Sequence, residues 1–196
     1  MDVGVLYSGG RDSTLAALVL EGLCDVTLLC GTFGVTDDHE HARDAAASVD
    51  LPARRIDFDA DVARDAAARI VADGFPRNGI QQVHEHALAV AADGGYDAVA
   101  DGTRRDDRVP RVDRPLAQHI EDSHGVSYLA PLAGVGRAAV DTLAEEHLVV
   151  ETGPSESVPK GDYETELRAL IADSHGESVV REVFPEHTQS RVRGWV

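Results

Sequence analysis

Short apolar runs alternate with longer amphipathic segments along most of this chain. A strand buried in a parallel sheet has a nearly continuous apolar run, whereas a helix packed on the sheet repeats its apolar positions every 3.6 residues. The alternation predicts an α/β protein with a parallel sheet and helices on both faces. The predicted strands span residues 3–7, 25–30, 53–58, 96–100 and 127–129, and the predicted helices span 13–23, 38–49, 60–73, 80–92, 116–123, 136–146 and 161–174.

The last part of the chain is less regular. Residues 152–160 are rich in Gly, Ser and Pro, so we expect a mobile loop there. The residues after Pro185 show no clear pattern and are expected to dock or fray. A length of 196 residues suits one domain of ordinary size. We therefore predict a single domain over residues 1–196, in which 152–196 supply a late loop, a helix and a C-terminal tail.

The composition narrows the possible partners. The chain has 35 acidic and 18 basic residues, for a net charge of −17. Free nucleic acid would be repelled, so direct nucleic-acid binding is not expected. A local basic pocket is still compatible with this composition. Lys160 is the only lysine. An acidic, lysine-poor surface is typical of proteins from salt-loving archaea, and we expect a halophilic protein; a GC-rich genome would also favour Arg over Lys.

Neither the chain start nor the cysteines indicate export. No uncharged apolar run is long enough to span a membrane, and the residues after Met1 lack a basic region followed by an apolar signal core. Cys24 and Cys30 are too few for a disulfide framework and lack the spacing of a metal site, so we expect buried thiols. The expected location is the cytoplasm.

The strongest chemical signal lies between the first strand and the first helix. Two glycines there allow a tight turn whose N–H groups approach an anion, and the start of the helix adds a positive dipole end. A glycine turn with a serine cap would use similar residues; the position and the full spacing favour an anion site. The stretch reads Ser8-Gly9-Gly10-Arg11-Asp12-Ser13-Thr14.

This stretch resembles the PP-loop of the ATP pyrophosphatases, a group that includes NAD synthetase, GMP synthetase, asparagine synthetase and tRNA-thiolating enzymes. No Gly-Lys-Ser/Thr sequence occurs, so it is not a Walker P-loop. The resemblance implies a Rossmann-like (HUP-type) doubly wound sandwich with a mostly parallel five-stranded sheet. It also implies cleavage of ATP between the α and β phosphates, which gives an adenylated substrate and pyrophosphate.

Further segments extend the resemblance over most of the first 165 residues. The stretch from Asp101 to Asp107 is similar to a Gly-Thr-Asn-x-Asp-Asp segment of the family, and Arg137 stands where a lysine is usual. The stretch from Lys160 to Glu164 resembles a late loop that closes over the phosphates. The implied ATP-binding residues are Ser8, Gly9, Gly10, Arg11, Asp12, Ser13, Cys30, Thr32, Gly102 and Thr103; the implied Mg²⁺ ligands are Asp12 and Asp106; and the implied catalytic cations are Lys160, Arg104 and Arg137.

The resemblance leaves three functions open. The first is an adenylating enzyme that uses ATP and Mg²⁺ to activate a carboxylate or carbonyl oxygen for a nitrogen nucleophile, as in an amide-forming ligase. The second is a sulfurtransferase that thiolates tRNA or a small molecule, for which Cys30 is the only plausible sulfur carrier. The third is a non-catalytic ATP sensor. The substrate is an unidentified small molecule or RNA, and a homodimer or a separate amide- or sulfur-donating protein is possible in each case.

Two histidine pairs lie in predicted helices, and their members are two residues apart. Residues two apart on a helix point about 200° away from each other, so neither His39 with His41 nor His84 with His86 is expected to chelate a metal. A loop at residues 74–79 places His84 near the mouth of the predicted site.

Overall fold

The computed structural model describes residues 1–196 and contains a five-stranded parallel sheet. The strand order is β3-β2-β1-β4-β5, and every neighbouring pair runs parallel. This confirms the predicted Rossmann-like fold class. The strands are β1 (Asp2–Leu6), β2 (Asp25–Thr32), β3 (Ala53–Asp57), β4 (Ala98–Ala100) and β5 (Ser127–Leu129).

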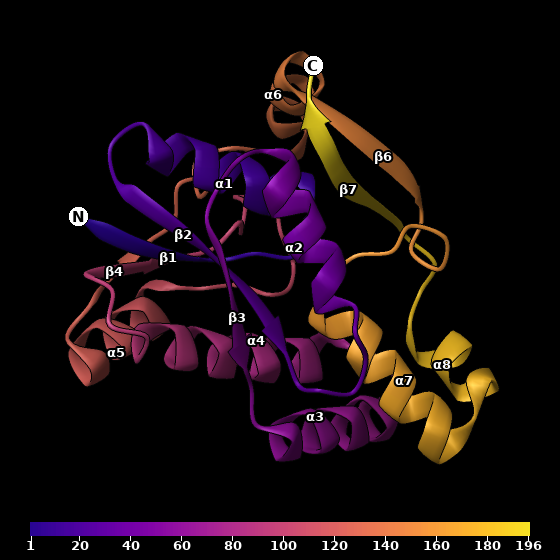
Figure 1. Ribbon diagram of the computed structural model, residues 1–196. Helices are drawn as coiled ribbons and strands as arrows, with labels where there is room; N and C mark the ends of the chain where they lie inside the picture. The colour runs from indigo at the N-terminus through magenta and orange to yellow at the C-terminus, as the bar shows by residue number, and fades with distance from the viewer.

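Helices cover both faces of this sheet (Figure 1). On one side lie α1 (Arg11–Glu21), α2 (His39–Ser48) and α6 (Arg137–His147). On the other side lie α3 (Ala60–Asp73), α4 (Arg77–Ala92), α5 (Arg114–His124), α7 (Tyr163–His175) and α8 (Glu177–Val183).

Alternation along β1 builds one core on each face. Val3 and Val5 pack with buried residues of α1 and α2, whereas Leu6 packs with residues of α3 and α4. Each such side chain contributes about 1.5–3 kcal/mol when it is fully buried. The two cores hold the carboxyl ends of the strands in place. The loops that follow the strands therefore begin at fixed positions along one edge of the sheet.

The C-terminal part contains a second sheet that the sequence did not predict. β6 (Leu148–Pro154) and β7 (Thr188–Trp195) pair antiparallel, and they stand apart from the main sheet beside α6 (Figure 1). The predicted loop at 152–160 is therefore wrong for its first residues, and the chain after Pro185 forms a strand. The pairing partners are far apart in sequence, so no local pattern reveals them. Helix α8 was also missed.

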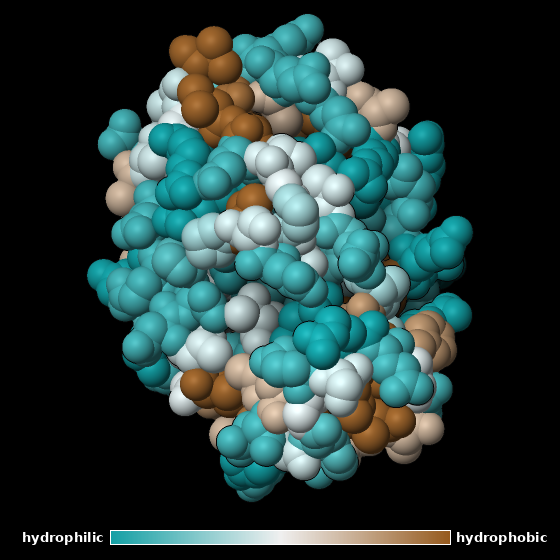
Figure 2. Space-filling view, turned by 90° about the vertical axis from the view of Figure 1, so that its right-hand side faces the viewer, coloured by the Kyte–Doolittle hydropathy of each residue, from teal (hydrophilic) through white to brown (hydrophobic).

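The surface agrees with the acidic composition. Figure 2 shows a mostly hydrophilic face with small, separate hydrophobic patches. No helix of the protein combines the length and the apolar character needed to cross a membrane.

Candidate functional site

A cavity of about 400 Å³ opens at the carboxyl ends of β1 and β4. In a doubly wound sheet this is the point where the strand order reverses and where ligands bind. Three segments form its polar part: the glycine turn after β1, the segment after β4 and the residues that lead into α7. The predicted site residues that line it are Ser8, Asp12, Ser13, Gly102, Thr103, Arg104 and Lys160.

The glycine turn leaves donors open at the start of α1. Gly9 has a φ of 79°, in the left-handed region that favours glycine. The side chains of Ser13 and Thr14 both donate to the Gly10 carbonyl oxygen, at 3.1 and 2.8 Å. The backbone N–H groups of Asp12 and Ser13 have no hydrogen-bond partner in the protein. Unpaired N–H groups at a helix start form a ready site for an anion.

The segment after β4 approaches this turn very closely. A β-carbon on Gly102 would lie only 2.7 Å from the backbone nitrogen of Ser13 and 2.8 Å from its Cα atom. Only glycine fits there without moving the backbone. Gly102 therefore brings Thr103 and Arg104 next to the start of α1.

The C-terminal part holds the same turn from the other side. The Ser8 carbonyl accepts a hydrogen bond from Gly161 N–H at 3.1 Å, and the Gly9 carbonyl accepts one from Val192 N–H at 2.9 Å. The residue before Gly161 is Lys160, so this contact also fixes the backbone that carries the lysine. β7 is thus part of the architecture of the site.

Two cations reach the cavity. Lys160 Nζ lies 3.0 Å from Asp162 Oδ2. Burial favours the neutral amine, but Asp162, with smaller contributions from Asp12 and Glu164, raises the pKa of Lys160 above its usual value. The lysine is therefore charged. Arg104 donates to Asp107, yet its buried Nη1 atom has no hydrogen-bond partner, with Asp12 Oδ2 3.5 Å away.

A buried polar chain that the sequence did not reveal lines the same cavity. Asp101 is 2% exposed, and its carboxylate accepts hydrogen bonds from Thr103 N–H and Oγ1 at 2.9 and 2.7 Å. It also accepts one from the Tyr128 hydroxyl at 3.1 Å and lies 2.8 Å from His84 Nε2. The other ring nitrogen of His84 lies 3.4 Å from the Tyr163 hydroxyl.

These contacts determine the charge states of Asp101 and Tyr163. Burial opposes ionisation of Asp101, but the contacts with His84 and Thr103 outweigh it and lower the pKa of the carboxyl. Burial, together with the charge of Asp101, raises the pKa of Tyr163, which therefore stays neutral. His84 was expected near the mouth of the site and does line the cavity. Asp101 could have been found from its place directly before Gly102 and Thr103.

Several predicted residues lie outside the cavity wall. Arg137 begins α6, and its side chain is 56% exposed and faces Asp141. Asp106 accepts a hydrogen bond from Arg137 N–H at 2.9 Å, which holds the pKa of its carboxyl below the usual value. Arg11 pairs with Asp12 and Asp141. The predicted residues outside the wall are Gly9, Gly10, Arg11, Cys30, Thr32, Asp106 and Arg137.

The end of β2 is occupied by a buried carboxylate. Glu166 of α7 accepts hydrogen bonds from Thr32 Oγ1 at 3.0 Å, from Phe33 N–H at 2.9 Å and from Val35 N–H at 3.0 Å. Thr32 was expected to bind ATP, and here its hydroxyl helps to hold the loop after β2 to α7. The apolar cavity wall nearby comes from Leu6, Leu29, Gly31, Phe58 and Ile80.

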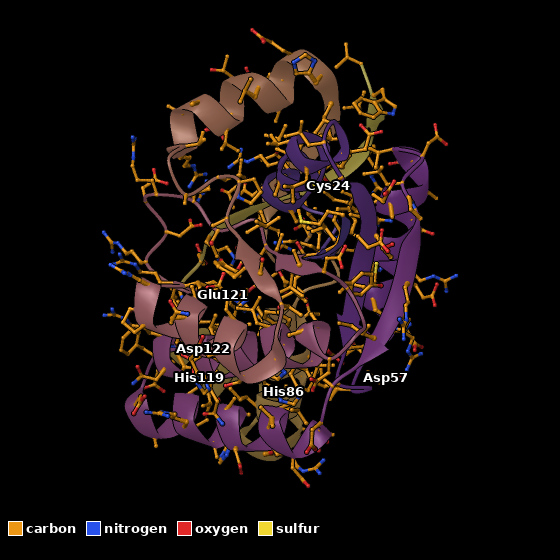
Figure 3. All side chains as sticks on the ribbon, turned by 90° about the vertical axis from the view of Figure 1, so that its left-hand side faces the viewer. Cys24, Asp57, His86, His119, Glu121 and Asp122 are labelled. Atoms are coloured by element: carbon orange, nitrogen blue, oxygen red, sulfur yellow. The ribbon has the colours of Figure 1, made fainter.

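The remaining histidines and cysteines lie elsewhere. His86 of α4, labelled in Figure 3, accepts a hydrogen bond from Asp59 N–H at 3.1 Å, whereas His84 contacts Asp101. Cys24, also labelled, precedes β2 and so lies at the opposite edge of the sheet from the cavity. Cys30 is fully buried in the core beside α1 and α2, and burial raises the pKa of its thiol to about 12.

Comparison with known proteins gives relatives over the full length. A family described as a family of unknown function, DUF7411, matches residues 1–194. The uncharacterized protein MJ0690 of Methanocaldococcus jannaschii is 37% identical over 99% of this chain and 96% of its own. A crystal structure described as a predicted subunit of tRNA methyltransferase, from the same organism, has a TM-score of 0.91 at 35% identity and covers 100% of this chain and 98% of its own. The U34-tRNA thiolase NcsA of Methanococcus maripaludis has a TM-score of 0.47 at 16% identity, over 74% of this chain and 56% of its own.

Proposed function

The chain belongs to the family of unknown function DUF7411, and we propose that it is an ATP-dependent adenylating enzyme. One observation carries the proposal: three kinds of unsatisfied or cationic donor converge on one cavity. They are the open N–H groups of Asp12 and Ser13, the ammonium of Lys160 and the unpartnered Nη1 of Arg104. Together they suit a chain of phosphates.

The cavity also fits the rest of a nucleotide. Its polar part surrounds the start of α1, and its apolar wall includes the ring of Phe58 and the backbone of Gly31. A β-carbon on Gly31 would collide with that ring, at 2.1 Å, so glycine keeps the ring against the strand. A purine would lie on this wall, with its phosphates directed to the open N–H groups.

Asp12 is the carboxylate that we propose for Mg²⁺. Magnesium is usually held by one or two carboxylates together with substrate phosphates, and it would neutralise phosphate charge. Asp12 lines the cavity, whereas Asp106 is engaged with the start of α6. The structure therefore favours Asp12 over Asp106 for this role.

The proposed reaction is attack by an acceptor oxygen on the α-phosphorus of ATP. The new P–O bond forms as the bond to the β-phosphate oxygen breaks, and pyrophosphate leaves with the electron pair. Lys160 and Arg104 would stabilise the charge that develops on the leaving group. A nitrogen nucleophile would then displace AMP from the activated acceptor.

The buried polar chain would present an acceptor atom to the substrate. Nε2 of His84 lies 2.8 Å from the Asp101 carboxylate and Nδ1 lies 3.4 Å from the Tyr163 hydroxyl, so with a neutral ring that carries its proton on Nε2, Nδ1 would accept from Tyr163. The oxygen lone pairs of Tyr163 are left for a donor in the cavity. We assign this tyrosine the role of orienting the attacking N–H group.

Thiolation of RNA is the second candidate. The relative described as a predicted subunit of tRNA methyltransferase supports RNA as the acceptor, and the resemblance to the PP-loop family suggests thiolation as the reaction. Since Cys30 is fully buried and its pKa is raised to about 12, we propose that any sulfur comes from outside the chain. Replacement of Cys30 by Ala should then leave sulfur incorporation unchanged, with Cys24→Ala as the control. Loss of incorporation in the Cys30 variant alone would identify Cys30 as the sulfur carrier.

The decisive experiment follows the fate of labelled ATP. The protein is incubated with Mg²⁺, ATP labelled at the α or the γ phosphate, and a panel of metabolites and RNA in high salt. Acceptor-dependent AMP and pyrophosphate are expected. ADP with phosphate would contradict α–β cleavage, and ATP binding without turnover under every acceptor would favour a non-catalytic sensor.

A further inference from the structure

A second hollow lies beside the nucleotide cavity. It has a volume of about 640 Å³ and lies between the start of α4 and the segment that leads into α5. The two cavities share a wall: Pro76 and Pro110 line the nucleotide cavity, while their neighbours Arg77 and Arg111 line the hollow. We name it the arginine hollow, after Arg77, Arg108 and Arg111.

The three arginines of the hollow have no carboxylate partner, a property that they share with a few others such as Arg54 and Arg181. Ion pairs hold most of the other arginines, among them Arg104 and Arg191. The hollow also contains two carboxylates, which have neutral hydrogen-bond partners: Glu85 accepts from Gln81 Nε2 at 2.9 Å, and Asp113 caps α5 by accepting from Leu116 N–H at 3.0 Å. The three exposed arginines outnumber these two carboxylates, so the hollow carries a net positive charge in a protein of net charge −17.

The backbone that carries these arginines is held in place. Gln81 of α4 donates from Nε2 to the Arg111 carbonyl at 2.9 Å, and its Oε1 accepts from Arg111 N–H at 2.9 Å. This paired contact ties the segment before α5 to α4. The backbone from which Arg111 extends is therefore fixed relative to α4, which places Arg77 and Arg111 on the same hollow.

An exposed aromatic ring lies on the same hollow. Phe75 follows the left-handed Gly74 that ends α3, and it is 49% exposed. Aromatic faces beside arginines are the usual means by which proteins hold unpaired bases of a single strand. A small phosphorylated metabolite would need the arginines but not an open aromatic face.

We propose that the arginine hollow binds single-stranded RNA, with phosphates on Arg77, Arg108 and Arg111 and a base stacked on Phe75. The inference rests on the proposed function, because the hollow then holds the acceptor across the shared wall from ATP. The overall negative charge repels RNA from the remaining surface, so binding is confined to the hollow. The prediction from net charge alone against RNA binding therefore does not apply to this local site.

The test compares two double variants of equal charge. R77Q/R111Q removes two arginines of the hollow, and R54Q/R181Q removes two exposed arginines without ion pairs elsewhere. Binding of a fluorescein-labelled single-stranded RNA oligonucleotide is followed by anisotropy over a range of salt concentrations. R77Q/R111Q should bind at least tenfold more weakly, with a salt slope smaller by about 1.4 for two lost contacts. R54Q/R181Q should bind as the unsubstituted protein does, and Phe75→Ala should lose about fivefold or more.

ATP binding is measured by calorimetry on the same variants. RNA binding that is absent, or equal in the two double variants, overturns the proposal for the hollow and leaves the ATP site untouched. A 5′-mononucleotide is measured as well. The proposal is also overturned if the mononucleotide binds as tightly as the RNA oligonucleotide, depends on the arginines and is unaffected by Phe75→Ala. RNA binding that depends on the hollow in a protein that binds no ATP contradicts the adenylating function and not the hollow.

Discussion

The two cavities on either side of the Pro76 and Pro110 wall differ in how their charges are balanced. In the cavity at the carboxyl ends of β1 and β4, Lys160 has Asp162 at 3.0 Å, and Arg104 has Asp107. In the arginine hollow no guanidinium has a carboxylate partner. The first cavity fixes its charged groups before substrate arrives, as chemistry requires. The second leaves its cations for the ligand to neutralise, as a binding surface requires.

This difference predicts different consequences of substitution. Groups that are paired and buried support both the fold and the chemistry, so their removal affects stability and turnover together. Exposed, unpaired arginines contribute little to stability, so their removal changes binding alone.

Lys160→Ala should have the largest effect. Loss of the ammonium removes charge stabilisation of the leaving pyrophosphate, and we expect pyrophosphate release to fall by about 10²–10³-fold. The free energy of unfolding should fall by only about 1–3 kcal/mol, because the pair with Asp162 is mostly but not fully buried. A coupled pyrophosphate assay and denaturant unfolding measure the two quantities. A release rate within about twofold of the unsubstituted protein would remove Lys160 from the mechanism.

Gly102→Ala should come next, because its β-carbon has no space against the backbone of Ser13. We expect ATP affinity to fall by at least about tenfold and the free energy of unfolding to fall by about 1–3 kcal/mol, since the glycine turn must move. Gly134→Ala is the matched control, because a β-carbon there meets nothing within 4 Å. Equal ATP affinity in the two variants would show that the close approach of the two segments does not shape the site.

Asp101→Asn should change the response of stability to acid. The folded-state pKa of Asp101 is lowered, so its stabilising contribution is complete above the unfolded-state value of about 3.9 and is lost as the pH falls through the folded-state value. The variant should be about 1–3 kcal/mol less stable at pH 6, where the carboxylate is ionised. It should also lose less stability than the unsubstituted protein between pH 5 and pH 3. The free energy of unfolding of both proteins is measured at each pH in the same salt. A difference between them that does not change with pH would contradict the role of this carboxylate.

Salt should act in opposite directions on the fold and on the hollow. Between about 0.1 and 1 M salt the screening length falls from about 10 to 3 Å, which weakens the repulsion among the charges that make up −17. The free energy of unfolding should therefore rise with salt while RNA affinity at the hollow falls. Thermal melting and anisotropy in the same buffers test both trends, and full stability in dilute buffer would count against a salt-adapted surface.

Neighbouring residues in the chain were enough to predict the main sheet and the glycine turn. The apolar runs of β1 and β2 and the glycine turn between β1 and α1 are local features, so they could be predicted from neighbouring residues. Lys160 was recognisable because it is the only lysine and lies in a segment that resembles a phosphate loop. The resemblance brought Gly102 and Thr103 to the same cavity because parallel strands end at one edge of the sheet.

The partners of these residues come from distant parts of the chain and are set by the fold. Nothing near Gly9 in sequence indicates that Val192 N–H binds its carbonyl, and nothing near Thr32 indicates Glu166. Likewise, Arg77 and Arg111 meet around one hollow because Gln81 of α4 holds the segment before α5. Local propensity acts over a few residues, whereas burial and hydrogen bonding act between whichever groups the fold brings together. The glycine turn could therefore be predicted from the chain alone, whereas its C-terminal support and the arginine hollow could not.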